Sequence, residues 1–99
     1  MVQAVENLTR ITGTVLARKP HPRLDAYELV SLRIDAAETV PGMQDLLGSQ
    51  RGNTIELSVR RALLEAAGTG QHLRCRAKLT PDGAMCEAHP DAGQFEMLP

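Results

Sequence analysis

Aromatic side chains are nearly absent from this sequence. Tyr27 and Phe95 are the only two among 99 residues, and there is no tryptophan. The hydrophobic core must therefore be built from Leu, Ile, Val, Ala and Met side chains. Proteins that hold unpaired bases commonly stack them on aromatic rings. The sequence excludes an extended aromatic platform of that kind and leaves Tyr27 as the candidate for stacking one base.

Long hydrophobic runs and a set of paired cysteines are also missing. No apolar run approaches the roughly 20 residues that a membrane-spanning helix needs, so we expect no membrane association. Residues 1–6 lack the basic start and apolar stretch of a secretory signal, and we expect a cytoplasmic protein. Two cysteines, Cys75 and Cys86, are too few for a disulfide framework. We therefore expect free thiols.

The sequence has no large excess of charge of either sign. Its net charge of −1 is unlike that of a strongly basic nucleic-acid-binding protein. Hydrophobic residues make up 42% of the chain and charged residues 23%, as in an ordinary globular protein. A length of 99 residues fits one domain with one modest core. We therefore predict a single domain over residues 1–99.

The sequence does contain a regular alternation of apolar and polar residues, which is typical of half-buried β-strands. The alternation predicts strands at 8–18, 25–37, 54–60, 71–80 and 84–88, and pairing could resume at 94–98. Gly13 predicts a bulge in the first strand, and the prolines within 19–24 predict a loop. Strong helix formers at 61–67, followed by Gly68, predict a short helix. Residues 80–83 predict a tight turn.

The predicted elements follow one another in the order β-β-β-α-β-β. This order, the glycine in the first strand, the 61–67 helix, residues 70–77 and the closing residues 94–98 resemble the OB-fold, the oligonucleotide/oligosaccharide-binding barrel. The closing residues are distantly similar to the last strand of bacterial single-strand-binding proteins. The resemblance covers about residues 8–98. It implies an all-β, five-stranded antiparallel barrel with one short helix, and a binding face over the second and third strands between the 1–2 and 4–5 loops.

Basic residues are the main functional signal. Seven of the eleven lie on predicted strands opposite the apolar residues, whereas most acidic residues lie in loops and at strand ends. A basic stripe of this kind would attract a phosphate backbone. The alternative is that these are ordinary solvated residues that deter edge-to-edge aggregation. For weak electrostatic binding of single-stranded DNA or RNA, we predict contacts from Arg33, Arg60, Arg74, Arg76, Lys78, Tyr27, Lys19 and Arg23.

A second group of residues suggests a different function. Leu29 lies on the outward face of the second predicted strand, and Met43, Leu46 and Leu47 crowd the following connection. Together they could form a contact with a protein partner or a homodimer interface. The alternative is that residues 43–47 form a helical turn that covers Leu29. The competing hypothesis is therefore a protein-interaction or assembly module.

Neither a metal site nor an enzyme is predicted. The pairs His72/Cys75 and Cys86/His89 have the spacing of zinc ligands. However, residues three apart on a strand point to opposite faces, so each pair diverges. No nucleophile elbow, phosphate loop or dinucleotide fingerprint is present. We therefore predict a non-catalytic binding module without a cofactor.

Overall fold

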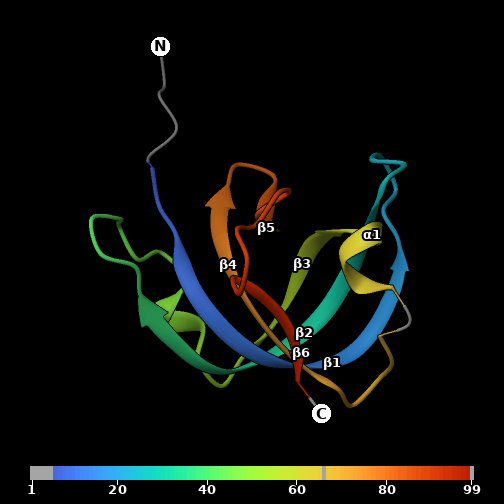
Figure 1. Ribbon diagram of the computed structural model, residues 1–99, viewed down its shortest axis with the longest axis horizontal. Helices are drawn as coiled ribbons and strands as arrows, with labels where there is room; N and C mark the ends of the chain where they lie inside the picture. The colour runs from blue at the N-terminus through green and yellow to red at the C-terminus, as the bar shows by residue number, and fades with distance from the viewer. Residues whose placement is uncertain (1–5, 66, 99) are drawn as a thin grey trace.

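The computed structural model describes residues 6–65 and 67–98, which form a curved sheet closed on itself (Figure 1). The strands are β1 Thr9–Pro20, β2 Tyr27–Thr39, β3 Thr54–Arg60, β4 His72–Thr80, β5 Gly83–Cys86 and β6 Phe95–Leu98. Between them lie a 3₁₀ helix, Gly48–Gln50, and a single α-helical turn, α1 Arg61–Leu64. No helix in the described part of the chain is long and apolar enough to cross a membrane.

Five strands close the barrel in the order β1-β2-β3-β5-β4, with β4 pairing back to β1. The predicted all-β class, with five barrel strands and one short helix, is confirmed. The expectation of wholly antiparallel pairing is wrong for one pair, because β3 and β5 run parallel, with Leu57 opposite Ala84 and Ser58 opposite Met85. A closed ring with an odd number of strands cannot alternate direction all the way round. At least one parallel pair is therefore unavoidable.

The sixth strand extends the edge of β4 beyond β5. Along that edge, β5 pairs with Ala77–Thr80 and β6 with His72–Cys75, while β1 occupies the opposite edge. The chain from 87 to 94 thus leaves the sheet and returns to it. The expected resumption of pairing at 94–98 is confirmed for residues 95–98.

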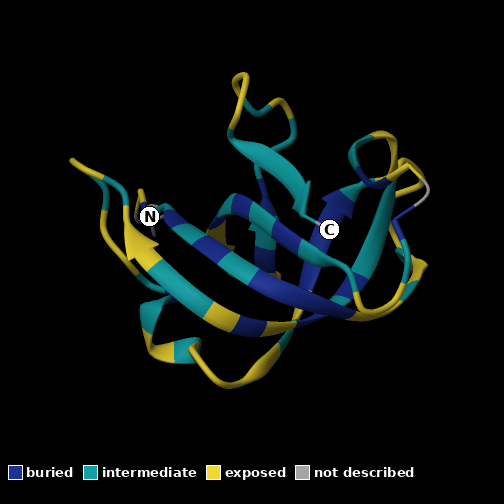
Figure 2. Cartoon of the chain, turned by 60° about the horizontal axis from the view of Figure 1, so that its bottom comes forward, coloured by how far each residue is buried: buried dark blue, intermediate teal, exposed yellow. Residues whose placement is uncertain are grey.

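The core fills the barrel with aliphatic side chains and two thiols. Buried residues alternate with exposed or half-buried ones along the strands (Figure 2). Leu64 of α1 and Leu47 of the 2–3 connection complete the core. The free thiols of Cys75 and Cys86 are both buried there. Burial and contact with Cys86 raise the pKa of Cys75, so this thiol stays protonated and behaves as a small apolar group.

Two irregularities in the β1–β2 pairing break the strict alternation. The register shifts between Thr12 and Gly13 and again between Val15 and Ala17. An added residue shifts every later side chain to the other face of the sheet. An irregularity is therefore present at Gly13, as expected, but the extra residue there is Asp35 of β2; at the second shift the extra residue is Leu16 of β1. Simple alternation along the predicted strands places Ala36 inward and Arg18 outward, and both directions are wrong for the same reason. Ala37 rather than Ala36 packs against the core, and Arg18 shares the inner face with its partner Val30.

Other boundaries also differ from the expectation. Strand β1 continues through Lys19 and Pro20 and β2 begins at Tyr27, so the 1–2 loop spans 21–26 and lies two residues later than predicted. The helix ends after one turn, because the chain takes a left-handed conformation at Glu65, with φ of 48°. Residues 43–47 form no helical turn, and the only helical residues of that connection are Gly48–Gln50.

Candidate functional site

A cleft of about 270 Å³ lies between the 1–2 loop and the β4–β5 turn. It is lined by His21, Arg23, Leu24, Ser58, Thr80, Asp82, Gly83, Ala84 and Met85. Ser58 and Met85 are directly paired on neighbouring strands and belong to this lining. Leu24 exposes 38% of its surface. The cleft thus combines apolar walls with polar and charged groups, as a site for an amphipathic ligand requires.

The 1–2 loop is held in one shape by the ring of His21. The backbone N–H groups of Arg23 and Leu24 donate to His21 Nδ1 at 3.0 and 3.1 Å. His21 and Leu24 also bond through their backbones to Tyr27, both at 3.1 Å. Because Nδ1 accepts these bonds, the proton of the neutral ring sits on Nε2. Nε2 can therefore donate to a ligand.

The opposite wall is a tight turn. Thr80 Oγ1 donates to the carbonyl of Gly83 at 2.9 Å and accepts from the backbone N–H of Asp82 at 3.1 Å. Gly83 has a φ of 117°, which only glycine adopts readily. Both walls of the cleft are thus set by local hydrogen bonds, and the site is preformed.

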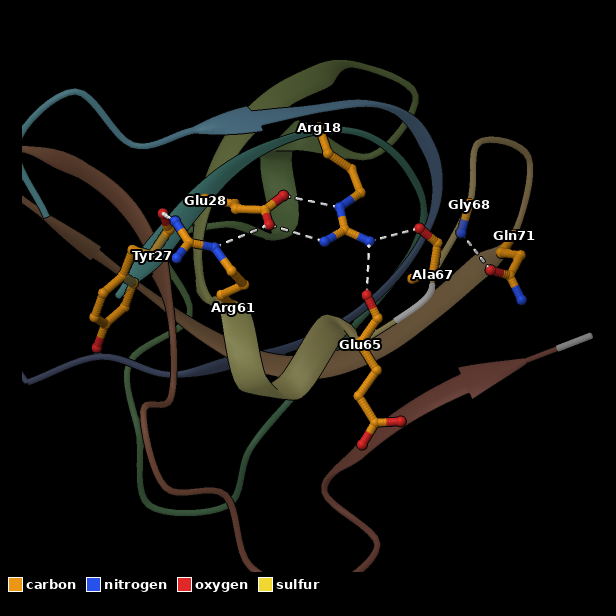
Figure 3. A network of polar contacts seen from close by, with 8 residues as sticks. All are labelled: Arg18, Tyr27, Glu28, Arg61, Glu65, Ala67, Gly68 and Gln71. Atoms are coloured by element: carbon orange, nitrogen blue, oxygen red, sulfur yellow. Dashed lines mark hydrogen bonds and ion pairs between the residues drawn. The ribbon is translucent and has the colours of Figure 1, made fainter. Parts of the chain in front are cut away.

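A half-buried ion pair joins β1 and β2 beside α1 (Figure 3). Arg18 Nε and Nη2 donate to the two carboxylate oxygens of Glu28 at 2.8 and 2.9 Å. Arg18 Nη1 donates to the carbonyls of Glu65 and Ala67 at 3.2 and 2.6 Å, just beyond α1. The side chains of Arg18 and Glu28 are only 21% and 12% exposed. Carbonyls at the end of a helix lack intrahelical partners, and Arg18 supplies donors for them.

The same network anchors the start of β2. Arg61 Nε lies 3.3 Å from Glu28 Oε2, and its Nη2 donates to the carbonyl of Tyr27 at 3.4 Å (Figure 3). The backbone N–H of Arg61 donates to the carbonyl of Ala26 at 2.8 Å. Arg61 therefore connects α1 to the end of the 1–2 loop and the start of β2.

Most of the predicted basic stripe is matched by carboxylates. Four of the predicted residues form ion pairs: Arg33 with Asp35 (3.0 Å), Arg74 with Glu96 (2.8 Å), Arg76 with Glu87 (2.7 Å) and Lys19 with Glu56 (3.5 Å). The Lys19 pair is exposed on both sides and worth little. Arg76 is held most firmly, because two of its nitrogens reach Glu87. These pairs reduce the positive potential of the barrel surface.

Three predicted cations have no acidic partner among the residues the structure describes: Arg23, Lys78 and Arg60. Arg23 lines the cleft. Lys78 lies directly across from Met85. Arg60 follows Ser58 by two residues on β3, a distance of roughly 7 Å along a strand, and faces Tyr27 on β2. Arg23 therefore belongs to the cleft lining, Lys78 lines a second, wider groove that shares Met85 with the cleft, and Arg60 lies on the strand that contributes Ser58 to the cleft.

Arg60 is the most unusual of the three. Its Nε is the one buried side-chain nitrogen or oxygen without a hydrogen-bond partner in residues 6–65 and 67–98. Leaving a buried donor unpaired costs about 1–3 kcal/mol. A change in the side-chain conformation of Arg60 would be needed to bring this donor to an acceptor outside the protein, and pairing there would remove the cost.

The residues predicted for protein contact separate in the structure. Leu47 is 2% exposed and belongs to the core, so it offers no surface to a partner. Leu29 and Leu46 are half-buried. Met43 lines a second, wider groove of about 750 Å³ together with Leu8, Leu79 and Met85 among others. In the alternation of the strand predicted at 71–80, Leu79 falls on the apolar, core-facing side, but it is 43% exposed there.

A polar cluster that the sequence did not indicate joins β1, β2 and β4. Thr14 Oγ1 donates to Asp35 Oδ2 at 2.7 Å and accepts from Arg33 Nη2 at 3.1 Å, with His72 Nδ1 at 3.2 Å. Thr14 is only 8% exposed, and its hydroxyl is fully engaged. The group resembles a catalytic triad in composition, but it holds strands together. No three potential metal ligands converge in the described part of the chain.

Three carboxyl groups should make the stability of the fold sensitive to low pH. Hydrogen bonds from Arg18, Thr14 and Thr9 lower the pKa values of Glu28, Asp35 and Asp45, respectively. The unfolded chain therefore binds protons more tightly at these groups, and the stability they provide is lost as the pH falls below about 4.3. We expect the urea midpoint to fall between pH 5 and pH 3, measured by circular dichroism. An unchanged midpoint would contradict the assigned contacts.

No protein-family model matches the sequence, and the searches of curated proteins and of solved structures also give no match. The function must therefore be argued from the cleft and the charges around it.

Proposed function

We propose that the protein is a non-catalytic module that binds single-stranded nucleic acid in the cleft between the 1–2 loop and the β4–β5 turn. The proposal treats the barrel as one of the oligonucleotide/oligosaccharide-binding type, distantly similar to bacterial single-strand-binding proteins. The strand order supports that assignment. In such barrels the ligand lies over β2 and β3, flanked by these two loops. The cleft lies between the same two loops and includes Ser58 of β3 in its lining, which supports the proposal, although no residue of β2 lines it.

The contacts divide between phosphate and base. Arg60, Lys78 and Arg23 would meet phosphates, because their charges have no acidic partner among the described residues. A base would lie against Leu24 and Met85 in the cleft, and Tyr27 would stack a neighbouring base. The paired cations Arg33, Arg74, Arg76 and Lys19 would contribute more weakly, because each must share its charge with a carboxylate.

One observation carries the proposal. The buried Nε of Arg60 lacks a hydrogen-bond partner, and Arg60 lies on β3 two residues beyond Ser58 of the cleft lining. A guanidinium binds phosphate through paired N–H groups, and a phosphate oxygen would satisfy this donor. An arginine with no role other than solvation would be expected to keep this N–H hydrogen-bonded to water.

The test measures fluorescence anisotropy of labelled oligo-dT and oligo-U at low and near-physiological salt. Three phosphate contacts on a single strand predict a slope of about −2 for log affinity against log salt. Replacing both Arg60 and Lys78 by glutamine should weaken binding about tenfold at low salt and reduce the slope to about −0.7. Arg51→Gln is the matched control, because Arg51 is exposed and lies outside the cleft lining.

The competing function is a protein-interaction or assembly module. The exposed Leu79 in the wider groove, beside Met43, favours it. The two functions give opposite results in solution. If neither oligonucleotide binds at low salt and light scattering shows a mass that rises with protein concentration, the nucleic-acid proposal is wrong and assembly replaces it.

A further inference from the structure

Asp82 places an uncommitted negative charge on the wall of the cleft. Its backbone N–H donates to Thr80 Oγ1, which fixes its position in the turn. The residue is exposed and lines the cleft together with His21 and Arg23. Across residues 6–65 and 67–98, its carboxylate forms no ion pair or side-chain hydrogen bond. A strong acceptor thus stands in the same cleft lining as Arg23, a cation with no acidic partner in the described part of the chain.

This carboxylate is unfavourable for an anionic ligand unless the ligand brings it a donor. A phosphate near Asp82 is repelled. Nucleic acid has two kinds of donor to offset this: the N–H groups of bases, and the ribose 2′-hydroxyl, which RNA has and DNA lacks. The choice between them depends on where base and sugar lie in the cleft.

The arrangement of the cleft walls favours the ribose hydroxyl over a base N–H as the donor to Asp82. The apolar surfaces of Leu24 and Met85 suit the flat face of a base. Arg60 and Lys78 would hold the phosphates, and the sugar is the group directly attached to the phosphate. A ribose would therefore lie between the apolar walls and the cations, within reach of the polar groups of the turn and the loop. A hydroxyl both donates and accepts, and it would find Asp82 as acceptor and His21 Nε2 as donor.

We infer that the cleft selects RNA over single-stranded DNA, with the Asp82 carboxylate accepting a hydrogen bond from a ribose 2′-hydroxyl. This inference rests on the proposed function. Carboxylates recognise ribose hydroxyls in the same way in dinucleotide-binding proteins. The Asp82 carboxylate repels phosphate, but its hydrogen bond to the 2′-hydroxyl would favour RNA over single-stranded DNA.

The experiment compares oligo-uridine with oligo-deoxyuridine of equal length, which differ only in the 2′-hydroxyl. The wild-type protein should bind the RNA about tenfold more tightly, the size expected for one hydrogen bond to a charged group. Asp82→Ala should reduce this ratio to nearly one, partly because the DNA binds more tightly once the repulsion is removed. Asp25→Ala is the charge-matched control in the 1–2 loop and should keep the ratio, because Asp25 is exposed and outside the cleft lining.

The outcomes separate this inference from the proposed function. Equal binding of the two uridine strands, or a tenfold ratio that survives Asp82→Ala, overturns the inference and leaves the function intact. A preference for oligo-deoxycytidine over oligo-deoxyuridine that disappears in Asp82→Ala, with no effect of the sugar, would show that the carboxylate contacts a base instead. Binding of no strand at all overturns both.

Discussion

Replacing Arg18 by methionine is expected to lower the free energy of unfolding by about 3 kcal/mol. The substitution keeps the aliphatic length of the side chain but removes the guanidinium. Glu28, 12% exposed, then retains only its 3.3 Å contact with Arg61. The carbonyls of Glu65 and Ala67 lose their donor as well. Breaking a buried ion pair by removing one partner is costly because the remaining charge stays desolvated.

The matched control is Arg74→Met. Arg74 also pairs with a glutamate at 2.8 Å, but the side chains of Arg74 and Glu96 are 40% and 38% exposed. Exposed pairs contribute about 0–1 kcal/mol. Urea unfolding followed by circular dichroism would measure both variants, with equal slopes required for the comparison. If Arg18→Met costs no more than Arg74→Met, the network in Figure 3 does not stabilise the barrel.

The fold followed from the sequence where the alternation was uninterrupted. Strand β3 begins at Thr54 and ends at Arg60, as predicted, because it has no bulge. In β1 and β2 the alternation alone did not predict the side-chain directions correctly, because each extra residue moves the side chains after it to the other face of the sheet. Arg18 is the clearest case. Its polar side chain indicated an outward position, and only the register with β2 shows that it points inward to Glu28.

The site was less predictable than the fold, because it depends on pairing between distant segments. Arg60, Lys78 and Arg23 were all identified from the sequence, but so were arginines that turn out to be neutralised. Arg74 lies directly across from Glu96 because β6 returns to the edge of β4. The length of the 87–94 excursion sets that register, and no local pattern determines it. Asp82 was interpreted only as a turn residue, since a turn sequence does not reveal which cleft the turn borders.

The register shift beside Gly13 leads to the second large effect, the replacement of Gly13 by alanine. A Cβ atom at Gly13 would lie 2.5 Å from the carbonyl oxygen of Arg33 and 2.6 Å from Leu32 Cγ. Both distances are well below van der Waals contact, and the carbonyl is part of the backbone and cannot rotate away. Forcing extra volume into a packed strand pair costs about 1–3 kcal/mol. We expect Gly13→Ala to lower the free energy of unfolding by about 3 kcal/mol, the upper end of this range.

The control for this substitution is Gly68→Ala, where the nearest atom to a Cβ is Gln71 Oε1 at an ordinary 3.8 Å and the backbone is not left-handed. There alanine should be neutral or slightly stabilising, because it restricts the unfolded chain. A Leu32→Ala background identifies the source of the Gly13 effect. It removes the contact with Leu32 Cγ but leaves the Arg33 carbonyl, so a large part of the cost should persist in the double variant. Complete relief would mean that side-chain crowding, and not the close approach of the two backbones, is what requires glycine in β1.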